Sequence, residues 1–197
     1  GIVYCGKTVL RQYPSDYIVG KDTETPVVLM GYLNPVEVIG YERFVSIAHE
    51  SGVDGILLVD LPPEESKDLE VVLKKYDMNQ IFLLAPTSTD ERIQHVANQA
   101  SGFIYYVSLK GVTGAATLDV TEAAQRIQKI KAVTDVPVGV GFGISDAASA
   151  KAMGSVADAV IVGSAFVKPF ANIAPEQAAE QAVNKVKELR AALDELV

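Results

Sequence analysis

The sequence predicts an α/β fold built around a parallel β-sheet. From Thr25 onward, short apolar runs alternate with longer amphipathic stretches. The short runs are apolar at nearly every position rather than at alternate positions, which is typical of strands buried on both faces, as in parallel sheets. Strands that alternate with helices form βαβ units. Their right-handed crossovers leave two main architectures, a doubly wound open sheet or a barrel.

Six segments are predicted to be strands. They are Pro26–Met30, Gly55–Val59, Gln80–Leu84, Gly102–Val107, Pro137–Val140 and Ala159–Val162. A barrel of eight βα units needs eight strands and about 250 residues, whereas this chain has 197 residues. A barrel made from this chain would therefore be short by about two βα units, and two open sheet edges are expected.

Amphipathic helices are predicted between the strands. They cover Val36–Ser51, Pro63–Tyr76, Thr89–Ala100, Thr121–Val133, Asp146–Met153 and Pro175–Leu196. Thr89, followed by Asp90 and Glu91, is a suitable N-cap with a first turn whose charge matches the helix dipole. The last helix is rich in Lys and Glu, so we expect it on the outside of the fold.

The first 25 residues do not show the same alternation of predicted strands and helices. Ile2–Cys5, Thr8–Leu10 and Tyr17–Gly20 have strand-like composition, but nothing between them has the length or period of a crossover helix. We therefore divide the chain into a divergent N-terminal segment, residues 1–25, and a (β/α) domain, residues 26–197.

Composition limits the classes of partner. The net charge is −8 and the sequence pI is about 4.8. An acidic chain repels nucleic acid and anionic membranes, so neither is expected as a partner, and no apolar run reaches the roughly 18 residues of a membrane span. Cys5 is the only cysteine, so no intrachain disulfide can form, which fits a reducing cytoplasm. No His, Cys and Asp grouping has metal-ligand spacing, so no metal site is predicted.

Glycine-rich turns follow the last two predicted strands. Gly139–Ser145 and Gly163–Ala165 each lead from a strand into a helix. Glycine lets the backbone approach a bulky anion, and a helix start presents unpaired N–H groups. The two turns together favour a phosphate site over ordinary tight turns. A third glycine loop, Lys110–Ala115, has the composition of a mobile lid, although an ordinary βα loop is the better explanation when this loop is considered alone.

Several segments together resemble tryptophan synthase alpha chains. They are VVLMGYLNPV (27–36), SGVDGILLVDLPPEES (51–66), FLLAPTS (82–88), YYVSLKGVTGA (105–115), GVGFGIS (139–145) and IVGSAFVK (161–168). They occur in that family's order and spacing from about residue 25 to the C-terminus. The resemblance implies a (β/α)₈ TIM barrel that is incomplete, with the six strands equivalent to strands 3–8.

The resemblance also implies a function. The family is a lyase of tryptophan biosynthesis that cleaves indole-3-glycerol phosphate to indole and glyceraldehyde 3-phosphate by a retro-aldol reaction. It works in the cytoplasm within an α₂β₂ heterotetramer. The family implies no cofactor for this chain, because pyridoxal phosphate resides in the partner beta subunit.

The resemblance also assigns roles to individual residues of this chain, at the positions that match the family's motifs. The resemblance assigns phosphate binding to Gly114, Gly143, Gly163 and Ser164, and a role in the lid loop to Thr113. It assigns the indole pocket to Tyr32, Leu57, Leu83, Tyr105 and Phe142. It places Asn34 and Pro62, together with Tyr32, at the interface with the beta subunit.

The family's two catalytic carboxylates have no counterpart in this chain. In the family, a glutamate and an aspartate follow the second barrel strand, which would precede residue 25. The acids of residues 1–25 are Asp16, Asp22 and Glu24, and none has a matching context. We therefore assign no catalytic residue and do not predict turnover by this chain.

Two other functions stay open. One is a non-catalytic, phosphate-binding partner of a beta subunit. The other is an aldolase that forms a Schiff base through Lys110, although that lysine lies in a loop rather than in a dry strand position. Asp60 ends a strand and could act as a base, but a structural or interface role is favoured. His49 and His95 lie on predicted helices and are expected at the surface.

Overall fold

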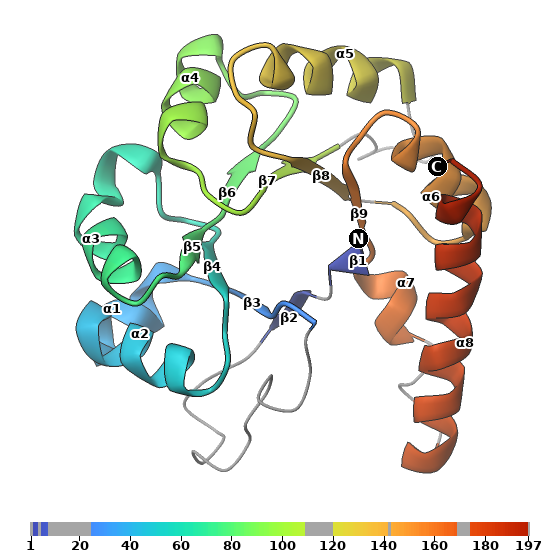
Figure 1. The fold of residues 1–197 in the computed structure, drawn as a ribbon, viewed down its shortest axis with the longest axis horizontal. Coiled ribbons are helices and arrows are strands. Elements are labelled where there is room, and N and C mark those ends of the chain that lie inside the picture. The colour runs from blue at the N-terminus through green and yellow to red at the C-terminus, as the bar shows by residue number, and fades with distance from the viewer. Residues whose placement is uncertain are drawn as a thin grey trace.

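The protein is a ring of parallel strands surrounded by helices (Figure 1). This computed structural model describes residues 2–3, 5–7, 25–108, 120–141, 143–168 and 174–196. The strands are β1 (Ile2–Val3), β2 (Cys5–Lys7), β3 (Val28–Gly31), β4 (Gly55–Leu58), β5 (Asn79–Gln80), β6 (Phe82–Leu84), β7 (Ile104–Val107), β8 (Val138–Gly141) and β9 (Ala159–Ile161). One sheet has the order β1-β9-β8-β7-β6 and the other β2-β3-β4-β5, with every pairing parallel. The architecture is the α/β barrel that was expected, with six strands after residue 25 when β5 and β6 count as one.

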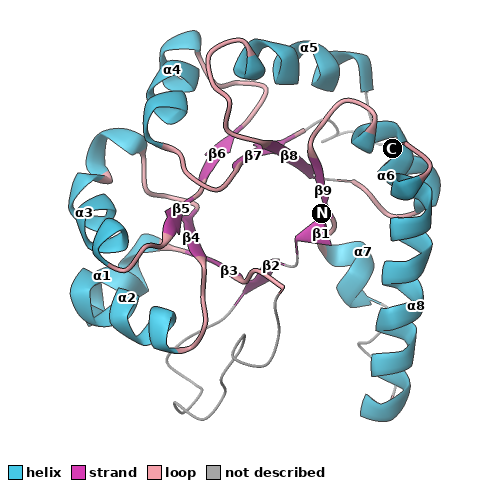
Figure 2. Cartoon of the chain, viewed as in Figure 1, coloured by secondary structure: helices cyan, strands magenta, loops and turns pink. Residues whose placement is uncertain are grey.

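The helices lie outside the strands, as Figure 2 shows. They are α1 (Leu33–Ile39), α2 (Tyr41–Glu50), the 3₁₀ turn η1 (Pro63–Glu65), α3 (Lys67–Lys75), α4 (Asp90–Gln99), α5 (Val120–Lys131), α6 (Ala147–Gly154), α7 (Ser164–Val167) and α8 (Pro175–Asp194). Thr89 caps α4 as predicted, because its side chain accepts a hydrogen bond from the Arg92 N–H. The helix predicted over Val36–Ser51 is instead two helices, since Gly40 has φ of 86° and ends α1 before α2 begins.

The N-terminal segment corrects the expectation of two open sheet edges. β1 pairs with β9, and β2, which follows almost immediately in the chain, pairs with β3. These are the two edges that six strands would leave without a partner, and unpaired edge groups would otherwise need another chain or water. A short N-terminal stretch therefore lies between the first and last strands of the (β/α) domain.

One predicted strand is divided between the two sheets. β5 pairs with β4, while β6 pairs with β7, and Ile81 lies between them. The Ile81 N–H donates to the Ile56 carbonyl, so the chain remains hydrogen-bonded through the break. The ring thus continues from one sheet to the other along this segment.

Alternate strand residues pack outward against the helices. In β6, β7 and β8 the outward set includes Leu84, Tyr106 and Val140, which belong to one buried cluster with residues of α4, α5 and α6. A second cluster joins β4 to α2 and α3. Because neighbouring residues of a strand point to opposite faces, the residues between these positions, such as Leu83 and Tyr105, face the interior of the ring.

At the amino ends of the strands, one carboxylate joins β3 to β4 and another joins β8 to β9. Asp54 Oδ2 accepts from the Val27 N–H at 2.6 Å, and Asp158 Oδ2 accepts from the Val138 N–H at 2.8 Å. Asp158 also pairs with Lys131 at 2.6 Å. Groups at this end of a parallel barrel serve stability, because the opposite, carboxyl end holds the site in such folds.

Two negative findings concern the described residues alone. None of the helices described here is long and apolar enough to cross a bilayer. Across the same ranges, no three His, Cys, Asp or Glu side chains are grouped so as to hold a metal ion.

Candidate functional site at the carboxyl end of the ring

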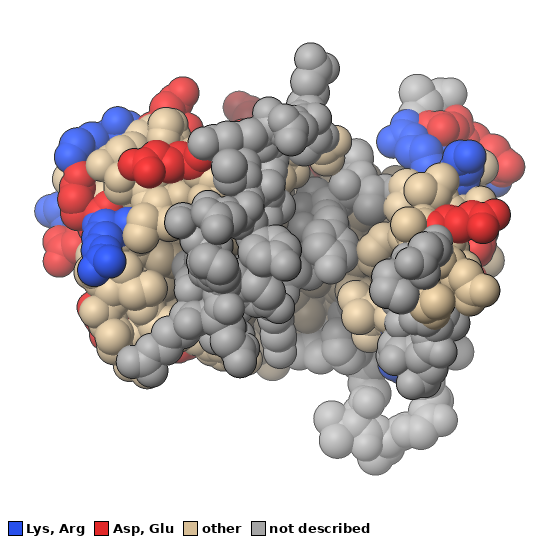
Figure 3. All heavy atoms as spheres, turned by 90° about the horizontal axis from the view of Figure 1, so that it is seen from below, with Lys and Arg blue, Asp and Glu red and all other residues tan. Residues whose placement is uncertain are grey.

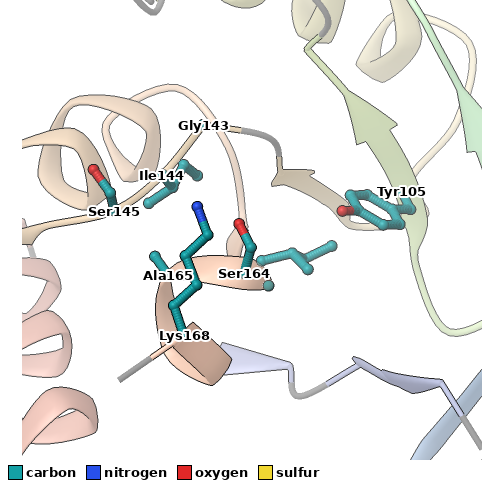
Figure 4. Close-up of a pocket in the computed structure, with 9 residues that line it drawn as sticks. Tyr105, Gly143, Ile144, Ser145, Ser164, Ala165 and Lys168 are labelled. Carbon is teal, nitrogen blue, oxygen red and sulfur yellow. The ribbon is translucent and has the colours of Figure 1, made fainter. Parts of the chain in front are cut away.

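A cavity of about 520 Å³ opens at the carboxyl ends of β8 and β9 (Figure 4). The residues described along it come from β7, from the turns after β8 and β9, and from α7. They are Tyr105, Gly143, Ile144, Ser145, Ile161, Gly163, Ser164, Ala165 and Lys168. The cavity therefore lies where parallel barrels place their ligands, and two strand-to-helix turns form part of its wall.

The two glycine turns predicted from the sequence meet at this cavity. Gly143 and the Gly163–Ser164 pair both line it. Gly143 has φ of 73°, in the left-handed region that favours glycine. Within the described part of the chain, the N–H groups of Gly143, Gly163 and Ser164 donate no hydrogen bond to protein. Among the described residues, nothing competes with a ligand in the cavity for these donors.

Tyr105 forms the wall opposite α7, and Figure 4 shows its hydroxyl directed toward the cavity. Its ring lies against the backbone of Gly141 so closely that a Cβ at Gly141 would be 2.5 Å from Tyr105 Oη and 2.7 Å from Cε2. The absence of a side chain at Gly141 therefore makes room for the aromatic ring. The sequence shows both residues, but only the pairing of β7 with β8 brings them together.

Other predicted wall residues lie deeper or farther round the ring. Leu83 is directly across from Tyr105 in the β6–β7 ladder. Leu57 on β4 is 1% exposed and belongs to neither outer cluster. Neither residue is among those described as lining the cavity. They contribute to the apolar interior beneath it, and their contact with a ligand stays a prediction.

The predicted interface residues lie on the far half of the ring, also at the carboxyl ends of strands. Tyr32 is the N-cap residue of α1, is 53% exposed and precedes Asn34. Pro62 follows β4, and Asp60 beside it accepts from the Leu33 N–H at 2.7 Å. That hydrogen bond joins the loops after β3 and β4, which is the structural role favoured for Asp60. Partner contact by these residues is untested.

The turn that carries Gly143 and Ser145 is fixed by the start of α6. Asp146 accepts from the Ser149 N–H at 2.8 Å, and Ser149 Oγ accepts from the Asp146 N–H at 3.2 Å, in a capping box. Ser149 Oγ also accepts from the Ser145 N–H at 3.1 Å. The hydrogen bond from the Ser149 backbone is the main reason that the pKa of Asp146 is lowered. The turn is thus held from the helix side.

Some predicted residues lie outside the described residues. They are Thr113, Gly114 and Phe142, the alternative nucleophile Lys110, and the N-terminal acids Asp16, Asp22 and Glu24. The two histidines lie on α2 and α4, as expected. His49 stacks against Tyr76 and His95 contacts Glu64 at 2.9 Å.

Sequence reasoning gave no individual role to five of the residues that line the cavity. They are Ile144, Ser145, Ile161, Ala165 and Lys168, of which Ile144, Ser145 and Ala165 lie within the predicted glycine turns. For Ser145 the signal was its place at the end of the glycine turn. For Lys168 it was a spacing of four residues from Ser164, which places both on one side of a helical turn.

Comparison with known proteins identifies the family. Residues 16–197 match the family model described as tryptophan synthase alpha chain. The chain is 82% identical over 177 residues to the tryptophan synthase alpha chain of Acinetobacter baumannii, covering 90% of this chain and 66% of that protein. It is 83% identical over 176 residues to that of Acinetobacter baylyi, covering 89% and 66%.

The chain belongs to the tryptophan synthase alpha chain family. Solved structures of family members have the same fold. The alpha subunit from Legionella pneumophila aligns with a TM-score of 0.75 at 38% identity, covering 89% of this chain and 65% of that one. A chain from the Pyrococcus furiosus study of mutual activation in the tryptophan synthase α₂β₂ complex aligns with a TM-score of 0.76 at 36% identity, covering 87% and 69%. This member of the family spans 66% of the length of its Acinetobacter relatives, just under two thirds.

Proposed function

We propose that this chain acts as the alpha subunit of tryptophan synthase and binds indole-3-glycerol phosphate at the carboxyl end of the ring. The observation that carries the proposal is that Gly143, Gly163 and Ser164 line one cavity with Tyr105. The turns supply N–H donors for a phosphoryl group, and the aromatic wall and apolar interior suit an indole ring. Gly114 and Phe142 complete the site in the resemblance to the family.

The reaction proposed is retro-aldol cleavage to indole and glyceraldehyde 3-phosphate. Breaking the carbon–carbon bond requires a proton at indole C3 and removal of a proton from the glycerol hydroxyl. A carboxyl group with a raised pKa can perform both transfers, and a second carboxylate beside the indole N–H stabilises the positive intermediate. This chemistry uses no cofactor of the chain's own.

One observation favours a second function, that of a phosphate-binding partner that does not cleave substrate. The described cavity lining contains Tyr, Ser and Lys side chains but no carboxyl group. We therefore propose binding as the chain's own activity and assign no catalytic residue. The Schiff-base alternative has less support, because Lys110 comes after the end of β7 (Ile104–Val107) rather than within a strand, where such lysines lie in a dry pocket.

The proposed partner is the tryptophan synthase beta subunit, which would hold the pyridoxal phosphate, in a cytoplasmic α₂β₂ assembly. The surface around Tyr32, Asn34 and Pro62 is its proposed contact. Figure 3 supports a partner other than nucleic acid, since acidic and basic side chains are interspersed on the described parts of the face it shows and no extended basic patch is visible there.

The test uses the intrinsic fluorescence of the ligand. The chain contains no Trp, so the indole emission of indole-3-glycerol phosphate can be followed without background when excited beyond the absorption of tyrosine. We expect saturable binding. The variant Ala165→Leu would fill the cavity from α7 and weaken binding strongly, whereas Ala148→Leu on the exposed side of α6 would leave it unchanged.

A second measurement decides between the two functions. Indole release is assayed from the bound substrate, with and without a beta subunit. Indole above the uncatalysed rate establishes the lyase, and binding without release establishes the non-catalytic partner. Absence of saturable binding to the intact chain would contradict both.

A further inference from the structure

Lys168 is a part of the cavity to which neither the motifs nor the family resemblance gives a role. It is the last residue of the segment IVGSAFVK (161–168) and directly follows α7. Figure 4 shows its side chain running past Ala165 and Ser164, with the ammonium nitrogen pointing toward Ile144. The only formal charge along the described lining thus lies between the two glycine turns.

Among the described residues, no acidic side chain pairs with this charge. Several lysines of the described chain pair with carboxylates, as Lys131 does with Asp158 and Lys129 with Asp90. Over the residues that the structure describes, Lys168 forms no ion pair or hydrogen bond. An ammonium group held at the mouth of a cavity without a counter-ion is suited to an anionic ligand.

A full positive charge at this position favours the binding of an anion. The chain has a net charge of −8, which opposes the approach of an anion. The nearest helix, α7, has only four residues, so its dipole is short. Backbone N–H groups can orient a phosphoryl group, but they carry only partial charges. The lysine in the cavity wall supplies a whole charge.

We propose that Lys168 is the specificity-determining residue of the pocket and makes it select a phosphoryl dianion. Its ammonium pairs with the phosphoryl oxygens, while the turns at Gly143 and Ser164 fix their orientation. The unphosphorylated ligand gains nothing from this contact. The inference rests on the proposed binding of a phosphorylated indole and adds the residue that distinguishes it from its dephosphorylated form.

The experiment compares two ligands on four proteins. Indole-3-glycerol phosphate and indole-3-glycerol are titrated by indole fluorescence against the wild type, Lys168→Met, Lys168→Arg and Lys67→Met. Lys67 is an exposed lysine at the start of α3, on the opposite side of the ring, and its replacement makes the same change in net charge. Thermal unfolding checks that each variant is folded, and Lys168→Gln replaces Lys168→Met if the latter is not.

We expect Lys168→Met to bind the phosphorylated ligand about tenfold more weakly, as for loss of one charged hydrogen bond, and the unphosphorylated ligand unchanged. Lys168→Arg and Lys67→Met should bind both ligands as the wild type does. Added salt should weaken wild-type binding more than that of Lys168→Met.

Two outcomes would overturn the inference while the proposed function stands. One is equal affinity of Lys168→Met and wild type for the phosphorylated ligand. The other is an equal loss of affinity for both ligands, which would mean that Lys168 maintains the shape of the pocket and does not interact with the charge of the phosphoryl group. Failure of the wild type to bind the phosphorylated ligand would overturn the proposed function itself.

Discussion

At the scale of single residues, the contact between Tyr105 and Gly141 decides the shape of the cavity. The strand residue before the glycine turn has no side chain, and the aromatic ring occupies the space that a Cβ would take. Because the interior is closely packed, such a contact cannot be relaxed without moving the ring. The position of Tyr105 in the wall therefore depends on a neighbouring strand as much as on its own.

A substitution series tests this dependence. Gly141→Ala should lower the free energy of unfolding by about 1–3 kcal/mol, as overpacking does, and should displace the Tyr105 ring. The double variant Gly141→Ala with Tyr105→Leu should recover most of that loss. Gly31→Ala is the control, because Gly31 also ends a strand but a Cβ there meets nothing within 4 Å. Denaturant unfolding measures these variants together with Tyr105→Leu alone, and full additivity of the two changes would count against the contact.

At the scale of elements, the carboxylate of Asp158 joins β9 to β8 and to the end of α5. Burial raises the pKa of this carboxyl, but the hydrogen bond from Lys131 and that from the Val138 N–H outweigh burial, so the pKa lies below its usual value. A lowered pKa in the folded state means that the charged form stabilises the fold. That stabilisation is complete above the ordinary Asp pKa of about 3.9 and is lost as pH falls through the lowered value.

The variant Asp158→Asn removes this effect. At neutral pH it should lower the free energy of unfolding by about 1 kcal/mol, the low end for a charged hydrogen bond, because the Asp158 side chain is 36% exposed. The difference from wild type should shrink as pH falls below about 4. Urea unfolding across this pH range measures it. Asp135→Asn, at an exposed site with no hydrogen bond to the rest of the described chain, should show no such pH dependence.

At the scale of the whole molecule, closure of the ring depends on a few N-terminal residues. β1 and β2 pair with the two strands that would otherwise be edges, β9 and β3. Open parallel edges present unpaired N–H and C=O groups to other chains. The N-terminal stretch therefore protects the molecule against self-association as well as joining the first and last strands of the (β/α) domain.

Removal of residues 1–7 tests this closure. We expect the shortened chain to self-associate and to unfold at lower temperature, because two edges become free. Size-exclusion chromatography with light scattering and thermal unfolding measure the two effects. Removal of residues 195–197, which follow α8 (Pro175–Asp194), serves as the control for shortening a terminus. A monomeric N-terminal truncation with unchanged unfolding temperature would contradict the closing role of β1 and β2.

The sequence by itself determined the features that depend on neighbours along the chain. Continuous apolar runs identified the six strands, Thr89 marked the start of α4, and the glycine turns after the last two strands indicated where a ligand would lie. Two consecutive parallel strands end at the same edge of a sheet, so the meeting of Gly143 with Gly163 and Ser164 could be anticipated from the order of elements alone.

Only the tertiary structure decided the contacts between residues far apart in the chain. The pairing of β1 and β2 with opposite edges, the division of β5 from β6 at Ile81, the closeness of Tyr105 to Gly141 and the reach of Lys168 into the cavity have no local signal. Each arises because, around a closed ring, backbone hydrogen-bonding groups must find partners and the interior must be closely packed. These requirements involve several strands at once, so the sequence pattern of a single segment does not predict the contacts.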